Sequence, residues 1–138
     1  MIDFSTNFGR RVAQLLESER VIWLTTAGPD NTPQPRPVWF LWDGTSLLIY
    51  SQPKTYKLLH IARSPNVSLN FNTDSEAHEV AVLTGDARVD TNAPPADKHQ
   101  KYSEKYRKGM AGLEMTPPEF ARDYSVAVRV TPTRLRGS

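Results

Sequence analysis

The sequence has no cysteine, little excess of either charge and no long apolar run. The lack of cysteine excludes disulfides, thiol catalysis, thiolate metal sites and iron–sulfur clusters, and it agrees with a cytoplasmic location. Lysine and arginine number 17 against 15 aspartate and glutamate, an excess too small to indicate nucleic acid binding. No apolar stretch approaches the roughly 20 residues that span a bilayer, and the N-terminus lacks a signal-peptide pattern. We therefore expect a cytoplasmic protein without a nucleic-acid or membrane partner.

Several catalytic motifs are also missing. There is no P-loop, no G-x-G-x-x-G fingerprint and no nucleophile elbow, which disfavours nucleotide-triphosphatase, Rossmann and α/β-hydrolase chemistry. The three histidines, His60, His78 and His99, are far apart in sequence, and none is paired at the spacing of a helical zinc site. We expect no bound metal.

The 138 residues fit one domain spanning 1–138. Alternating and β-branched segments predict strands at 21–26, 38–42, 46–50, 67–71, 79–90 and 126–131. Helical spacing and capping signals predict helices at 5–19, 55–63 and 94–108, and a fourth that starts with the capping box at 116–119. Hairpins rather than regular strand–helix–strand units join most strands, so we expect an antiparallel barrel or sheet with added helices, a mostly β fold of the α+β class.

Four local features refine this prediction. Pro33, Pro35 and Pro37 need a strand edge or an irregular entry into a strand. Gly85 predicts a bulge or a close approach of another backbone. Trp39 and Trp42 are three residues apart on one predicted strand, so they should face opposite sides, one toward a core and the other toward a pocket or interface. The cationic residues of the third helix predict a solvated face, with anion attraction as the alternative: Lys98, Lys101, Lys105, Arg107 and Lys108.

Chemistry is expected where the strand at 46–50 leads into the helix at 55–63. Hydroxyl and ammonium groups gather there, at 51–57, beside a helix N-terminus whose free N–H groups suit a phosphate. The alternative is that Thr55 only caps the helix and the two lysines are solvated. Arg36, between two prolines, is a further candidate partner for a phosphate or carboxylate, or is simply exposed.

Four ordered segments carry a resemblance to a known family. They read WLTTAGPDNTPQPRPVWFLWDG, LLIYSQPKTYKLLHIARSPNVSLNF, LTGDARV and VAVRVTPTRLRG, and they extend from about Trp23 to Arg136. Together they resemble the pyridoxamine 5′-phosphate oxidase-like split-barrel superfamily, most strongly its actinobacterial enzymes that use the deazaflavin coenzyme F420. Many relatives carry an arginine in the phosphate segment, where this chain has only lysines.

The resemblance implies an FMN-binding-like split β-barrel of six or seven antiparallel strands. It also implies a homodimer in which each of two cofactor sites is built from both subunits. The strand from Pro37 to Phe40 would lie beside the tricyclic ring, the segment from Ser51 to Lys57 would hold the phosphate, and the C-terminal arginines would reach the cofactor or substrate region. The implied cofactor-binding residues are Pro37, Val38, Trp39, Ser51, Gln52, Lys54, Lys57, Arg134 and Arg136.

The implied activity is that of an F420-dependent oxidoreductase, which transfers a hydride from the reduced deazaflavin to a small organic acceptor. No side chain is nominated as a catalytic acid or base, because the cofactor carries the chemistry. One alternative is an FMN-dependent flavoprotein like pyridoxamine 5′-phosphate oxidase, and another is a non-catalytic flavin or deazaflavin carrier. Without the resemblance, a β-domain that stacks single-stranded nucleic acid on its aromatic residues remains open.

Overall fold

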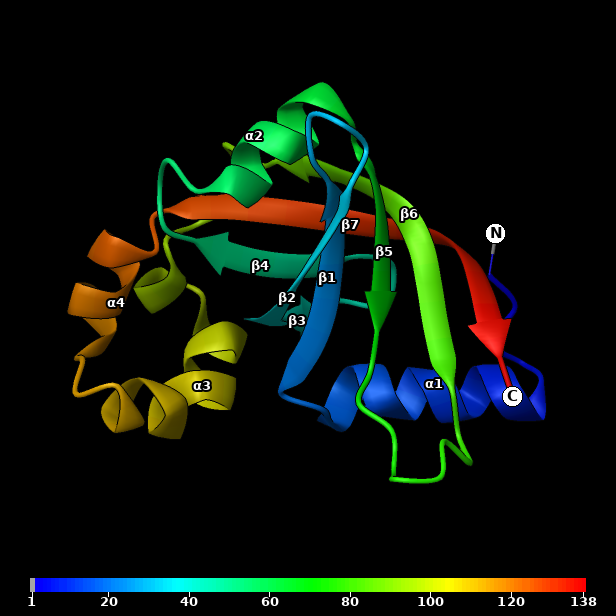
Figure 1. Ribbon diagram of the computed structural model, residues 1–138. Coiled ribbons are helices and arrows are strands. Elements are labelled where there is room, and N and C mark those ends of the chain that lie inside the picture. The colour runs from blue at the N-terminus through cyan, green and yellow to red at the C-terminus, as the bar shows by residue number, and fades with distance from the viewer. Residues whose placement is uncertain (1) are drawn as a thin grey trace.

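The computed structural model describes residues 2–138 and shows a seven-stranded antiparallel sheet with helices around it (Figure 1). The strands are β1 (Val21–Ala27), β2 (Pro33–Trp39), β3 (Leu41–Trp42), β4 (Leu47–Ser51), β5 (Asn66–Asn70), β6 (Ala81–Val89) and β7 (Val126–Gly137). The α-helices are α1 (Asn7–Ser18), α2 (Tyr56–Arg63), α3 (Gln100–Gly112) and α4 (Pro117–Asp123), and a 3₁₀ helix, η1, covers Ala96–Lys98. The predicted antiparallel α+β class is confirmed.

The sheet curls because its two outermost strands are consecutive in the chain. The strand order is β2-β1-β5-β6-β7-β4-β3, which puts β2 and β3 at opposite edges. Only Phe40 separates these two strands, so the two edges must come together, and β2 also contacts β4. The result is a barrel split along this line, as the resemblance implied.

The edge position of β2 explains why this strand tolerates three prolines. Pro33, Pro35 and Pro37 lie opposite residues of β1, and β2 has no second neighbour in the sheet. Proline lacks an N–H donor and is therefore confined to such edges. The predicted edge is confirmed, although the strand begins at Pro33 rather than at Val38.

Gly85 allows two backbones to approach closely, as its position in the sequence predicted. The pairing of β6 with β7 shifts register between Thr84 and Gly85. A Cβ atom at Gly85 would lie 2.1 Å from the carbonyl oxygen of Thr131. Any side chain here would therefore force β6 and β7 apart.

Two apolar clusters stabilise the fold, one inside the barrel and one beside it. The first fills the barrel, and α1 adds Val12 and Leu16 to it. The second lies between the outer face of β4 and the helices α3 and α4, and it is rich in aromatic residues: Leu48, Tyr50, Ala96, Tyr102, Tyr106, Met110, Phe120 and Ala127. In Figure 1 these helices stand to the left of the barrel, whereas α1 runs beneath it.

Three predicted boundaries are corrected by the structure. Pro94 and Pro95 do not open the long helix: they precede η1, and α3 begins at Gln100, where the ring of His99 accepts a hydrogen bond from the N–H of Tyr102 (3.3 Å). That helix ends at Gly112, not at Lys108. The last strand extends to Gly137 because it pairs with the whole length of β6, a long-range contact that its own alternation does not reveal.

The break between β2 and β3 is closed by α3. The hydroxyl of Tyr106 accepts the N–H of Phe40 at 2.7 Å and lies 2.7 Å from the carbonyl oxygens of Phe40 and Arg20, one of which accepts its proton. Lys105 Nζ donates to the same Phe40 carbonyl (2.8 Å) and lies 3.9 Å from the centre of the Phe40 ring. Lys105 is thus half-buried, and burial lowers its pKa to about 8. The predicted solvated lysine face is wrong at this residue; the other four cations are exposed.

The break between β2 and β3 also separates Trp39 from Trp42, which the sequence predicted to lie on one strand. Trp39 ends β2 and stacks on Tyr106, with ring centres 4.7 Å apart and planes 6° from parallel. Trp42 belongs to β3 and meets Phe4 edge-on at the other side. The prediction of one strand was therefore wrong, because Phe40 interrupts the pairing. The prediction that one indole would face a pocket and the other a core is confirmed, since Trp39 lines the pocket described below and Trp42 packs against the barrel core.

Gly109 makes room for the indole of Trp39. A Cβ atom at this position of α3 would lie 2.8 Å from Cη2 and 2.9 Å from Cζ2 of Trp39. Gly112, one turn further along the same helix, has no atom within 4 Å of such a Cβ. Because stacking on Tyr106 and Phe120 holds the indole, it has little freedom to move away.

We therefore expect Gly109→Ala to lower the free energy of unfolding by about 1–3 kcal/mol, as overpacking does. Gly112→Ala is the matched control, and it should raise that free energy by up to about 1 kcal/mol, because alanine favours helix. Urea unfolding followed by circular dichroism measures both. Equal stability of the two variants would show that the Trp39 ring is not held in place.

Candidate functional site

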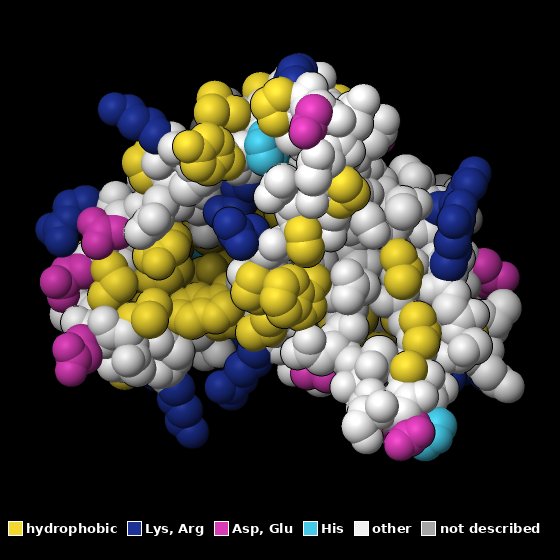
Figure 2. All heavy atoms as spheres, in the orientation of Figure 1, with side chains coloured by type: hydrophobic (Ala, Val, Ile, Leu, Met, Phe, Trp, Pro, Cys, Tyr) yellow, Lys and Arg dark blue, Asp and Glu magenta, His cyan; other side chains and the backbone are white. Residues whose placement is uncertain are grey.

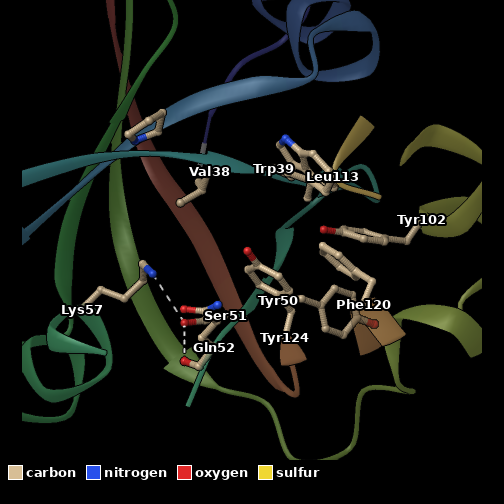
Figure 3. A pocket seen from close by; sticks show the side chains of 11 residues that line it. Val38, Trp39, Tyr50, Ser51, Gln52, Lys57, Tyr102, Leu113, Phe120 and Tyr124 are labelled. Atoms are coloured by element: carbon tan, nitrogen blue, oxygen red, sulfur yellow. Dashed lines mark hydrogen bonds between the residues drawn. The ribbon is translucent and has the colours of Figure 1, made fainter. Parts of the chain in front are cut away.

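One pocket lies between the barrel and the added helices. It has a volume of about 280 Å³ and receives side chains from β2, β4, α2 and the region of α3 and α4. Figure 2 shows apolar side chains lining a recess between the helices and the barrel, with a cationic side chain at its side. The lining residues are Pro37, Val38, Trp39, Tyr50, Ser51, Gln52, Lys57, Tyr102, Leu113, Phe120 and Tyr124 (Figure 3).

One end of the pocket is polar and is built where β4 leads into α2. Ser51 ends β4 and is buried, and its Oγ lies 3.2 Å from Thr55 Oγ1. Lys57, in the first turn of α2, donates from Nζ to Ser51 Oγ at 3.4 Å. Thr55 does not cap α2 with its side chain, which leaves the first N–H groups of the helix without that partner. Hydroxyls, an ammonium group and a helix N-terminus thus converge.

The charge at this end is unbalanced. Lys57 is half-buried, and burial lowers its pKa, with the positive charge of Arg36 adding to the effect. Within residues 2–138, no carboxylate forms an ion pair with either Lys57 or Arg36. Two neighbouring cations without an acidic partner repel each other, so an anion bound between them would relieve that repulsion.

The other end of the pocket is aromatic. Trp39 stacks on Tyr106 and also on Phe120, whose ring centre lies 5.5 Å away at an interplanar angle of 16°. Phe120 in turn stacks on Tyr124 at 4.4 Å. These flat, parallel rings suit a planar apolar ligand, and the pocket as a whole therefore suits a molecule with a planar part and an anionic part.

The structure brings six of the nine predicted site residues together in this pocket: Pro37, Val38, Trp39, Ser51, Gln52 and Lys57. Lys54 does not line it. This residue is exposed and has a φ of 62° in the turn before α2. Arg134 borders a different hollow, over β1, β5 and β6, and Arg136 is exposed opposite Val82 of β6. Within one subunit, the two arginines are therefore apart from the pocket.

Sequence reasoning missed five lining residues, four of them aromatic: Tyr50, Tyr102, Leu113, Phe120 and Tyr124. Phe120 and Tyr124 are four residues apart, a spacing that places them on one side of a helical turn. This spacing signals a packed face but not its partner. The contact of Phe120 with Trp39 depends on how α4 docks against β2, which no local pattern specifies.

Two further kinds of feature are absent from the described part of the chain. No group of three or more His, Asp or Glu side chains within residues 2–138 is arranged to hold a metal ion. None of the helices described is long and apolar enough to cross a membrane.

Comparison with known proteins places the fold. A structure named F420 reductase is similar with a TM-score of 0.66 and 26% identity, covering 89% of this chain and 94% of that one. A Listeria innocua protein assigned as a pyridoxamine 5′-phosphate oxidase has a TM-score of 0.68 at 23% identity, with coverages of 93% and 95%. A Clostridium acetobutylicum protein related to general stress protein 26, of the pyridoxine phosphate oxidase family, has a TM-score of 0.73 at 16% identity, with coverages of 99% and 90%.

The family itself is shown by sequence. No curated protein matches the chain. The profile of the pyridoxamine 5′-phosphate oxidase family, however, matches residues 8–137, which include every strand of the split barrel and the whole pocket. The chain therefore belongs to the pyridoxamine 5′-phosphate oxidase family.

Proposed function

We propose that this protein is an oxidoreductase that uses the deazaflavin coenzyme F420 to reduce a small organic acceptor. The observation that carries the proposal is that Lys57, which lies near the charge of Arg36 and has no ion-pair partner among the described residues, lines the same pocket as an aromatic wall. The family match supports a flavin-type cofactor, and the similarity to an F420 reductase at 26% identity favours the deazaflavin.

The pocket residues fit such a cofactor. Lys57 and the hydroxyl of Thr55 would hold its phosphate. Ser51, whose hydroxyl donates to the carbonyl of Gln52 at 2.8 Å, would position the ammonium group by accepting its hydrogen bond. Val38 and Trp39 would border its ring and exclude water from it. When bound, the cofactor supplies the hydride-transfer chemistry itself.

Two titratable side chains of the pocket, Tyr50 and Lys57, are already engaged by the chain. Burial raises the pKa of Tyr50 to about 12, and its hydroxyl donates to the carbonyl of Pro94 at 2.6 Å. Lys57 is turned toward Ser51 at the polar end. The protein's part in the reaction is therefore to position the reactants and to set the electrostatic environment, with Lys57 balancing the phosphate charge.

FMN is the second candidate cofactor, and the family match favours it. FMN has the same two chemical requirements, a planar ring and a phosphate, so the pocket geometry alone does not discriminate between the two. A carrier that binds either cofactor without turnover has the same requirements.

Titration of the purified protein with F420 and, separately, with FMN tests the proposal. We expect saturable quenching of cofactor fluorescence by F420, with markedly weaker binding of FMN, and steady oxidation of reduced F420 when an acceptor is supplied. Tighter binding of FMN would favour the alternative enzyme. Binding of F420 without turnover across a panel of acceptors would favour the carrier, and binding of neither would contradict the proposal.

We also propose that a second copy of the chain completes the site. A volume of about 280 Å³ lies just below the roughly 300–1,000 Å³ typical of small-molecule sites, so one subunit encloses only part of a large cofactor. Two apolar residues of α2, beside Lys57, stand out into solvent: Tyr56 is 79% exposed and Leu59 is 62% exposed. An apolar patch at the rim of an incomplete site is suited to burial against a partner.

Light scattering should therefore give twice the chain mass of 15.6 kDa. Leu59→Lys should shift the mass toward the monomer and weaken cofactor binding together, because the charge would be buried at the interface. Ala62→Lys, an exposed substitution on the same helix, is the control. A monomeric wild-type protein that binds cofactor tightly would contradict the proposal.

Lys57→Met separates the binding role of this lysine from any structural role. We expect the affinity for the cofactor to fall roughly tenfold to a hundredfold, as loss of a charge-assisted bond predicts. The free energy of unfolding without cofactor should not fall, because the substitution removes a half-buried charge that Arg36 repels. Lys54→Met, an exposed lysine outside the pocket, should change affinity little. Equal effects of the two substitutions on affinity would remove Lys57 from the site.

A further inference from the structure

One buried side-chain polar atom in the described residues has no hydrogen-bond partner, and it belongs to the pocket. The hydroxyl of Tyr102 in α3 is fully buried and unpaired. Its two tyrosine neighbours are paired: the hydroxyl of Tyr50 donates to Pro94, and that of Tyr106 bonds the backbone at Phe40. An unpaired buried hydroxyl is destabilising, so its presence calls for a partner outside the folded chain.

The position of Tyr102 indicates what that partner is. The residue lines the pocket, and its hydroxyl points toward the interior at the end opposite Lys57 (Figure 3). Its ring is fixed by Tyr50, with ring centres 4.7 Å apart at 77°, and by Tyr106 at 4.8 Å. A water molecule would need two or more polar partners here, and the surroundings are mainly aromatic rings. A ligand oxygen is the better partner, and it reaches the buried hydroxyl when a neighbouring side chain of the pocket wall shifts as the ligand binds.

The hydroxyl is also held in its protonated form. Burial raises the pKa of Tyr102 well above its ordinary value of 10, and the neighbouring tyrosines add to the effect. The group is therefore a hydrogen-bond donor at all physiological pH values.

We infer that Tyr102 is the residue that selects the acceptor: its hydroxyl donates a hydrogen bond to an oxygen of a planar, apolar acceptor stacked in the aromatic end of the pocket. The inference rests on the proposed function, since it assigns the cofactor to the cationic end and the acceptor to the other. Acceptors with a carbonyl or nitro oxygen are preferred over equally shaped molecules without one, because they alone satisfy the buried donor.

The test compares binding of two probes of nearly equal shape, acetophenone and ethylbenzene, measured by nuclear magnetic resonance titration. The protein is used both without cofactor and saturated with whichever cofactor binds. We expect the preference of the wild-type protein for acetophenone to fall by about three- to tenfold in Tyr102→Phe, the effect of one neutral hydrogen bond. Cofactor affinity should stay unchanged, and the Tm should stay equal or rise, because the substitution removes an unpaired hydroxyl.

Tyr106→Phe is the matched control in the same aromatic cluster. It should lower the Tm, because it breaks the bonds to Phe40, and should leave the preference between the probes as it is in the wild type. An unchanged preference in Tyr102→Phe would overturn the inference. A weakened cofactor affinity in that variant would also overturn it and would assign the hydroxyl to the cofactor, and a lowered Tm would show a structural partner. Failure of the proposed function appears separately, as absence of cofactor binding by the wild-type protein.

Discussion

The pocket depends on the contact between α3 and the backbone at Phe40. At this residue the chain leaves one edge of the sheet and joins the other, so the N–H and carbonyl groups lose the strand partners that regular pairing would supply. Tyr106 and Lys105 replace those partners. The same helix provides the ring on which Trp39 stacks and the glycine that leaves room for it. The contacts of α3 thus both close the barrel and shape the aromatic end of the pocket.

The polar end of the pocket differs, because its charged side chains do not stabilise the chain in the absence of a ligand. Lys57 is kept beside Arg36 and partly removed from water, without a carboxylate to balance either charge. A site selected only for stability would exchange such a lysine for an apolar residue. Lys57 stands at the start of a helix whose N-terminus has no side-chain cap. This arrangement is explained if the lysine contributes to binding an anion rather than to the stability of the unbound chain.

Much of the barrel could be predicted from local sequence, whereas half of the pocket could not. The prolines of β2, Gly85 and the capping box at Thr116 each express a steric or hydrogen-bonding rule that acts within a few residues, and the structure confirms all three. The helix start after Pro95 was predicted wrongly because long-range contacts decide it. The aromatic wall was missed for the same reason, since it forms only when α4 packs against the end of β2.

The two ends of the pocket come from different parts of the fold, which suggests that they have different roles. The cationic end comes from β4, α2 and the edge strand β2, all parts of the barrel whose geometry is fixed by pairing. The aromatic end, with the unpaired hydroxyl of Tyr102, comes from helices that are attached to the outer face of β4 through side-chain packing. Packed helices can change their lining residues without altering strand register. Under the proposed function, cofactor binding therefore depends on the barrel, whereas the choice of acceptor depends on α3 and α4. The hydroxyl of Tyr102 is a single donor in an apolar wall, and it disfavours an acceptor without an oxygen because that acceptor would leave the hydroxyl unpaired.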